Sequence, residues 1–78
     1  MELVNITRPG SQEQVFLVMR GGAKAGLISK FKPQAGYQHP WKAFKLDGAA
    51  KMQPNTMIEV FYGAGAKNKA IKAVLGAA

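Results

Sequence analysis

The longest uninterrupted apolar run in the chain, Val15 to Met19, is only five residues long. That length is far below what a membrane-spanning segment needs. An apolar run this short, without polar alternation, is typical of a β-strand that is covered on both faces. We therefore expect a central strand in a two-sided core. The alternative is a homodimer in which a second copy of the chain covers one face of that strand.

Short strand-like segments, each bounded by glycine, proline or another turn-forming residue, occupy most of the chain. The expected strands are Leu3–Thr7, Gln14–Arg20, Leu27–Lys32, Trp41–Leu46 and Met57–Tyr62. The glycine-rich segment 21–26 predicts a flexible hairpin loop between the second and third strands. Alternation along the third strand places Lys30 and Lys32 on the same face as Ile28.

The last segment changes to a helical period. Apolar side chains recur there at helical spacing, at Ala70, Ile71, Val74 and Leu75. Gly76 is expected to cap the carboxyl end of this helix. A helix of about ten residues is too short to be stable alone in water, so it must dock on the sheet. The sequence thus predicts a single domain, residues 1–78, of the α+β class: a small antiparallel sheet of four to five strands with one C-terminal helix. A small SH3- or OB-like barrel is the alternative.

Composition limits how this domain is stabilised. A chain of 78 residues has a thin stability margin, because small domains bury only about 60% of their unfolded surface. The chain has no cysteine, so apolar packing must supply the core without disulfides or Cys-based zinc sites. No basic segment followed by an apolar stretch opens the sequence at Met1, as a signal peptide would require. We expect a soluble, cytoplasmic protein without membrane contact.

The charge of the chain is strongly positive, with eleven Lys and Arg residues against four Asp and Glu. No acid occurs between Glu13 and Asp47, where basic residues are interleaved with aromatic ones. Positive charge beside flat rings is typical of nucleic-acid binding, because phosphates attract the charge and bases stack on the rings. The candidate contacts are Arg20, Lys24, Lys30, Lys32, Tyr37, Trp41, Lys42 and Lys45, with Lys67 and Lys69 at the start of the helix.

Trp41 allows two interpretations of equal weight. An exposed indole beside Lys45 could stack on a base, which contributes about 1–3 kcal/mol per base. A buried indole would instead belong to the core under the helix.

The segment from Gly63 to Lys69 has some of the character of a phosphate-binding loop. Glycines there precede a helix N-terminus, whose free amides favour anions, and Lys67 lies beside them. The spacing is not that of a P-loop, so the glycines are better explained as a strand-to-helix turn. A contact from this turn to a backbone phosphate remains an expectation.

Catalysis has little support in the sequence. His39 is the only imidazole, there is no thiol, and the four acids are scattered without a paired motif. We expect no enzyme activity, no cofactor and no metal site, and we expect His39 to be an ordinary loop histidine.

Three motifs resemble those of short phage- or prophage-encoded proteins of unassigned role: Gly26-x-Ile28-x-Lys30, His39-Pro40-Trp41-x-Ala43-Phe44 and Lys69-Ala70-Ile71-x-x-Val74-Leu75. In outline, a three-stranded sheet followed by a helix is also similar to the AP2 and integrase amino-terminal DNA-binding modules. Those modules lay the sheet in the major groove of DNA. That resemblance implies DNA contacts from Arg20, Lys30, Lys32, Lys42, Trp41 and Lys45.

These observations favour a small, non-enzymatic nucleic-acid-binding protein, with DNA rather than RNA as its partner. It would contact the phosphate backbone through a basic, aromatic-interleaved sheet face. The first alternative is a phage-like inhibitor or adaptor that docks on an acidic protein partner. The second is a minor subunit of a larger assembly.

Overall fold

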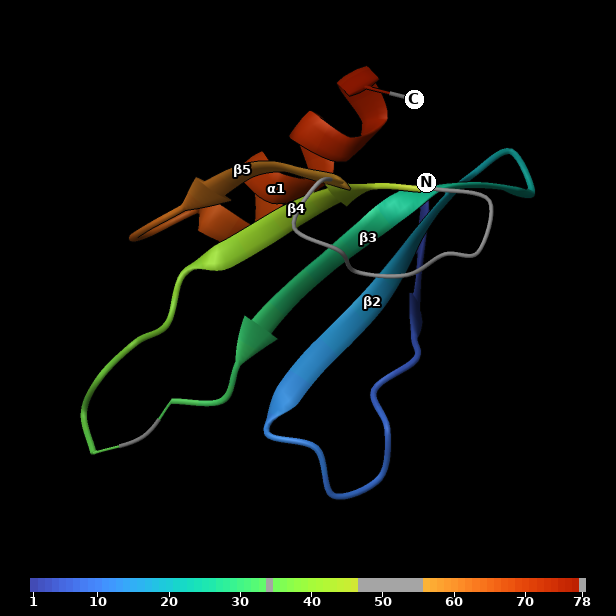
Figure 1. Cartoon of the computed structure of the whole chain (residues 1–78). Coiled ribbons are helices and arrows are strands. Elements are labelled where there is room, and N and C mark those ends of the chain that lie inside the picture. The colour runs from blue at the N-terminus through green and yellow to red at the C-terminus, as the bar shows by residue number, and fades with distance from the viewer. Residues whose placement is uncertain (34, 47–55, 78) are drawn as a thin grey trace.

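The computed structural model describes residues 1–33, 35–46 and 56–77. The elements in these ranges are β1 (Glu2–Asn5), β2 (Glu13–Arg20), β3 (Ala23–Phe31), β4 (Trp41–Lys45), β5 (Met57–Phe61) and α1 (Ala66–Ala77). Each strand pairs antiparallel with the next, and α1 lies against one face of the sheet (Figure 1). The expected α+β class is confirmed. The barrel alternative is wrong, because β1 and β5 are open edges of the described sheet.

The turn between β2 and β3 is tighter than the sequence suggested. Gly21 and Gly22 both have positive φ, at 58° and 80°. Two consecutive residues of that kind form the two-residue hairpin turn that matches the twist of a sheet. Pairing therefore begins at once, with Ala23 opposite Arg20. The loop expected over residues 21–26 is wrong, because only its first two residues are needed to turn the chain.

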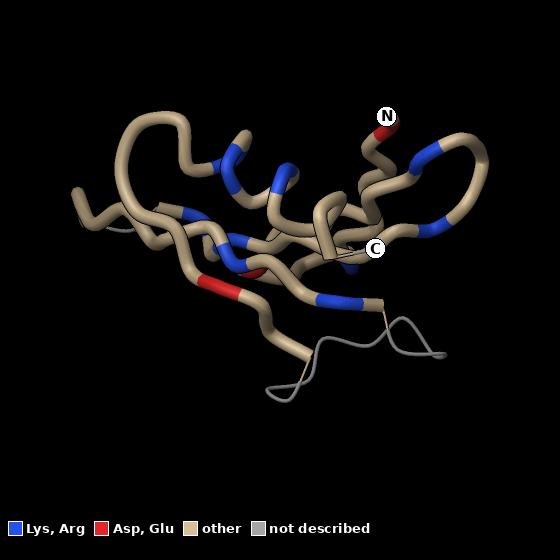
Figure 2. Tube along the Cα trace, turned by 90° about the horizontal axis from the view of Figure 1, so that it is seen from above, with Lys and Arg blue, Asp and Glu red and all other residues tan. Residues whose placement is uncertain are grey.

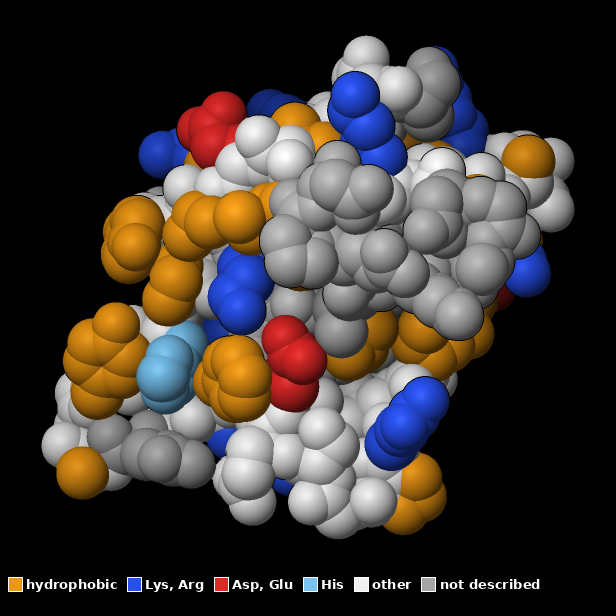
Figure 3. All heavy atoms as spheres, in the orientation of Figure 1, with side chains coloured by type: hydrophobic (Ala, Val, Ile, Leu, Met, Phe, Trp, Pro, Cys, Tyr) orange, Lys and Arg blue, Asp and Glu red, His pale blue; other side chains and the backbone are white. Residues whose placement is uncertain are grey.

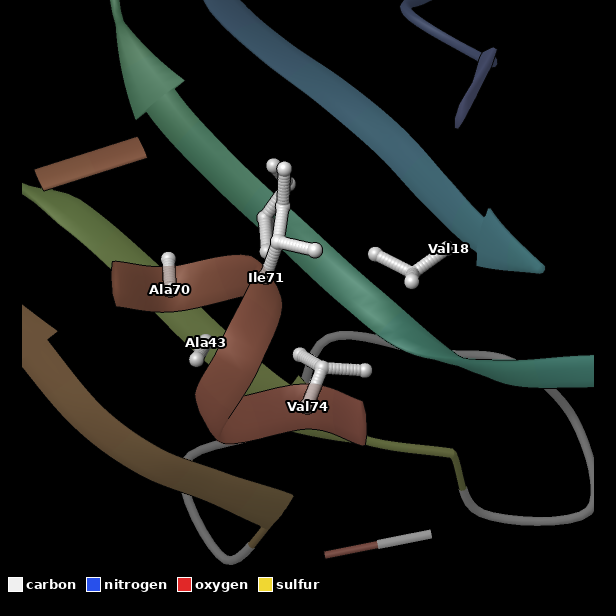
Figure 4. Packing of buried hydrophobic residues seen from close by; sticks show 6 residues of the cluster. Val18, Ala43, Ala70, Ile71 and Val74 are labelled. Atoms are coloured by element: carbon white, nitrogen blue, oxygen red, sulfur yellow. The ribbon is translucent and has the colours of Figure 1, made fainter. Parts of the chain in front are cut away.

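The main core lies between α1 and the sheet face that it covers, which we call the helix face. Its buried members come from both layers and are Val18, Ile28, Ala43, Ala70, Ile71 and Val74 (Figure 4). Small alanine side chains on both sides allow the helix to approach the strands closely. The expected docked helix is confirmed, but Gly76 lies inside its last turn instead of capping it. No helix in the described ranges has the length and apolar character needed to cross a membrane.

A second apolar cluster lies on the other side of the sheet, which we call the opposite face. Leu17, Leu27 and Phe44 are buried there. The run from Val15 to Met19 therefore contributes buried side chains to both faces of the sheet, because Leu17 belongs to this cluster and Val18 to the helix-face core. A strand buried on both faces, as the run predicted, is confirmed.

Gly26 on β3 lies where the helix packs closely on the sheet, and it should not tolerate a side chain. A Cβ built there would lie 2.5 Å from the Phe44 carbonyl oxygen and 2.7 Å from Cγ1 of Val74. We expect Gly26→Ala to lower the free energy of unfolding by about 1–3 kcal/mol through overpacking. Urea denaturation followed by circular dichroism measures this change.

Gly76→Ala is the matched control. Apart from the chain neighbours and the backbone of the helix itself, no atom of the described residues lies within 4 Å of a Cβ at that position. The control should be neutral or stabilising by up to about 1 kcal/mol, as alanine is in helices. Equal stability of the Gly26 variant and the wild type would contradict the close packing of α1.

Candidate nucleic-acid interface

Aromatic side chains gather at one end of the sheet. Strands β3 and β5 end there and β4 and α1 begin there, because each strand of the meander reverses the direction of the one before. These element ends and the turns beside them contribute six rings, which we call the aromatic end: Phe31, Tyr37, His39, Trp41, Phe61 and Tyr62. The side chains of Tyr37 and Tyr62 are the most exposed of these, at 56% and 70%.

On the helix face, two lysines from different elements lie close to the same indole. Nζ of Lys30 on β3 is 5.7 Å from the ring centroid of Trp41, and Nζ of Lys67 on α1 is 5.6 Å from it. Nζ of Lys67 also lies 5.1 Å from the ring centroid of Phe16. The Phe16 ring packs on that of Trp41, and their centroids are 6.0 Å apart. Cation–π attraction favours this arrangement, which we call the Trp41 cluster: Phe16, Lys30, Trp41 and Lys67.

Trp41 thus combines features of both interpretations offered by the sequence. Its side chain is half-buried and packs against the helix-face core. Its ring also lies at the surface near two ammonium groups. The indole is therefore a fixed support for positive charge as well as a part of the packing.

The start of α1 adds to the positive potential of the Trp41 cluster. The helix follows a turn in which Gly63 and Gly65 have φ of 83° and 77°. The first turn of α1 contains Lys67 and no acidic residue. Because the amino end of a helix carries partial positive charge, the macrodipole and the Lys67 ammonium act with the same sign. An anion bound beside them would relieve this repulsion.

A hollow of about 380 Å³ opens beside the Trp41 cluster. Its walls come from the loop before β4, the end of β5 and the turn leading into α1. The side chains that give it chemical character are Lys30, Gln38, His39, Trp41, Phe61 and Tyr62. Among the residues that the structure describes, none that lines the hollow is acidic. Oε1 of Gln38 accepts a hydrogen bond of 3.3 Å from Nζ of Lys30, which orients both side chains at the rim.

His39 also connects the hollow with the opposite face. The centroid of its ring lies 4.5 Å from that of the Tyr37 ring, in an edge-to-face arrangement, and 5.4 Å from that of the Phe31 ring. Nζ of Lys42 lies 4.9 Å from the Phe31 ring. Figure 3 shows the histidine flanked by hydrophobic side chains, with an acidic side chain nearby. The sequence suggested an ordinary loop histidine, and its place between two rings was not foreseen.

One acidic side chain lies close to this part of the opposite face. Oε2 of Glu13 accepts a hydrogen bond of 3.1 Å from the hydroxyl of Ser29, which is fully buried. The same oxygen lies 3.9 Å from Nζ of Lys42. Glu13 therefore satisfies a buried hydroxyl and partly neutralises Lys42.

The lysines of the middle strands do not form one cationic sheet face, and that expectation is wrong. Residues directly opposite in an antiparallel pair share a face, and Ser29 pairs with Lys42. Lys42 therefore lies on the opposite face, whereas Lys30, one residue further along β3, lies on the helix face. Figure 2 shows basic residues on the helix, on the strands and on the β2–β3 hairpin. Lys30, Lys42 and Lys67 all lie at the same end of the sheet, but they do not share one of its faces.

The remaining predicted contacts lie elsewhere. Arg20, Lys24 and Lys45 are exposed toward the other end of the sheet. Nη1 of Arg20 donates a hydrogen bond of 3.3 Å to the Leu75 carbonyl oxygen near the carboxyl end of α1, where a cation is favoured. Lys32 and Lys69 are exposed, near the end of β3 and on α1 respectively.

No protein-family model matches the chain, and comparison with curated proteins and with solved structures finds no similar protein. The resemblances to phage-encoded proteins and to AP2 and integrase modules therefore stay predictions. The candidate interface is defined by its own geometry.

The Glu13–Ser29 contact can be tested by stability measurements. Glu13→Ala removes the acceptor of a fully buried hydroxyl and should lower the free energy of unfolding by about 1–3 kcal/mol. In the double variant, Glu13→Ala with Ser29→Ala, the free energy of unfolding should fall by less than the sum of the decreases in the two single variants, because no unpaired hydroxyl remains. Urea denaturation of all four proteins completes the cycle. Additive losses would contradict a coupled pair.

Proposed function

We propose that this protein binds nucleic acid, with DNA as its partner, without catalysing a reaction. The observation that carries the proposal is the Trp41 cluster beside the hollow. There, Lys30 and Lys67 hold two ammonium groups within 6 Å of one ring centroid. The adjoining walls are aromatic, and within the described part of the chain they contain no acid.

This arrangement offers complementary groups to both parts of a nucleotide. Ammonium groups attract phosphates and release their counterions, which supplies most of the sequence-independent affinity. Aromatic side chains offer surfaces on which bases or sugars can pack. Lysines that are kept near a ring and near a helix start are also preorganised, so binding orders fewer side chains.

The docking mode differs from that of a sheet laid in a groove. The helix covers one face of the sheet, and the centre of the opposite face is apolar, with Leu17, Leu27 and Phe44 buried in it. We therefore place the contact at the aromatic end, with Lys32 and Lys42 as flanking phosphate contacts. We place this binding in the cytoplasm, the compartment that the sequence suggested.

An acidic protein partner would engage the same lysines. It would depend on charge and would have no need of the aromatic hollow. The experiments that follow separate the two, because they use purified nucleic acid alone.

The proposal predicts salt-dependent binding that follows particular lysines. About four neutralised phosphates, one for each of the four lysines at the aromatic end, give a log-log salt slope of about −3 on single strands and about −4 on duplex. Fluorescence anisotropy of a labelled DNA of about 16 nucleotides, at salt concentrations of about 50–200 mM, measures this slope. Lys30→Gln and Lys67→Gln should each weaken binding to any sequence and reduce the magnitude of the slope by about one.

Lys72→Gln is the matched control for Lys67→Gln. Lys72 is exposed on the same helix, on the side away from the sheet. Lys72→Gln removes one positive charge, as Lys67→Gln does, but leaves the Trp41 cluster unchanged. The loss of affinity should therefore be clearly smaller for Lys72→Gln than for Lys67→Gln. Equal losses for the two variants would show that binding follows net charge alone. An absence of binding at low salt would overturn the proposed function.

A further inference from the structure

The hollow is of the right size and character to hold one planar group of a nucleotide. Small-molecule sites enclose about 300–1,000 Å³ and combine apolar walls with a few polar groups. This hollow, of about 380 Å³, lies at the lower end of that range. Its aromatic walls come from Trp41, Phe61 and Tyr62, and its polar side chains from Gln38 and His39.

Of the aromatic walls, Tyr62 is the one placed to stack on a ligand. Its side chain is 70% exposed, whereas Phe61 is half-buried. The Trp41 ring already has two ammonium groups near it and packs on Phe16. An incoming ring can therefore lie against Tyr62 without displacing packed side chains. It would be oriented by the side chains of Gln38 and His39 at its edge.

A base in a duplex cannot enter such a hollow, because both of its faces are already stacked and its edge is paired. Entry into a pocket requires an unpaired base, as in a single strand, or extrusion at a cost of a few kcal/mol. Proteins that bind single strands combine stacking rings with cations that follow the backbone. Lys30 lines the hollow, and Nζ of Lys67 lies 5.6 Å from the ring centroid of Trp41 in its wall, so both ammonium groups are near enough to attract the phosphates of an inserted nucleotide.

We propose that the hollow between β4, β5 and α1 receives one unpaired base of single-stranded DNA, stacked on Tyr62, while Lys30 and Lys67 hold the adjoining phosphates. The protein therefore prefers single strands to duplex of the same sequence. This inference rests on the proposed function and adds to it the form of the nucleic acid and the place of a base.

The test compares three labelled DNAs of equal length: a single strand, the same strand with every base removed, and the duplex. All three carry phosphates, so binding through charge alone should not require bases. We expect the base-bearing strand to bind about five- to 150-fold more tightly than the abasic strand, the range of a single base–aromatic stack. It should also bind more tightly than the duplex. The emission of Trp41, the only tryptophan, should change with the base-bearing strand and much less with the abasic one.

Tyr62→Ala should remove most of the difference between the base-bearing and abasic strands, and Tyr62→Phe should keep it. Met57→Ala is the matched control, since Met57 is also exposed and lies at the other end of β5. Thermal unfolding of each variant checks that the fold is intact.

Equal binding of base-bearing and abasic strands, or equal effects of Tyr62→Ala and Met57→Ala, would overturn the base site and leave the proposed function in place. Failure of all three DNAs to bind at low salt would overturn both.

Discussion

The close approach of α1 to the sheet is the constraint on which the rest of this structure depends. Gly26 leaves no room for a Cβ between the Phe44 carbonyl and Val74. Ala43 and Ala70 are fully buried in the same interface. Small residues on both layers allow the helix to lie low over β3, β4 and β5. In a chain of 78 residues without cysteine, this packing and the apolar cluster on the opposite face must together offset the entropy of folding.

The same packing builds the candidate site. With α1 fixed over the strands, its first turn meets the sheet where β4 begins. Lys67 is thereby placed beside Phe16 and Trp41. Lys30 reaches the same indole from β3. Four residues from three strands and the helix thus form one charged, aromatic surface. Phe16 and Trp41 serve both roles, since their rings pack against the core and support the ammonium groups.

Much of the fold could be predicted because its signals are local. Glycine and proline mark the turns, alternation identifies the strands, and helical spacing of Ala70, Ile71 and Val74 identifies the docked helix. The errors were also local in origin. Segment 21–26 suggested a long loop because its composition is flexible, yet Gly21 and Gly22 suffice for a tight turn. Gly76 resembled a cap, but a glycine inside a last turn has the same sequence signature.

The sequence by itself determined the fold class, the positive charge and the mixture of lysines with rings, because these depend only on residue type and short-range period. It could not say which lysines meet. Antiparallel pairing of Ser29 with Lys42 puts Lys30 and Lys42 on different faces. Docking of the helix brings Lys67, from far along the chain, to the same indole as Lys30. The hollow, the place of His39 between two rings and the Glu13–Ser29 contact were likewise decided only by the tertiary structure. The physical reason is that register and helix docking are set by packing between distant segments, which no local pattern records.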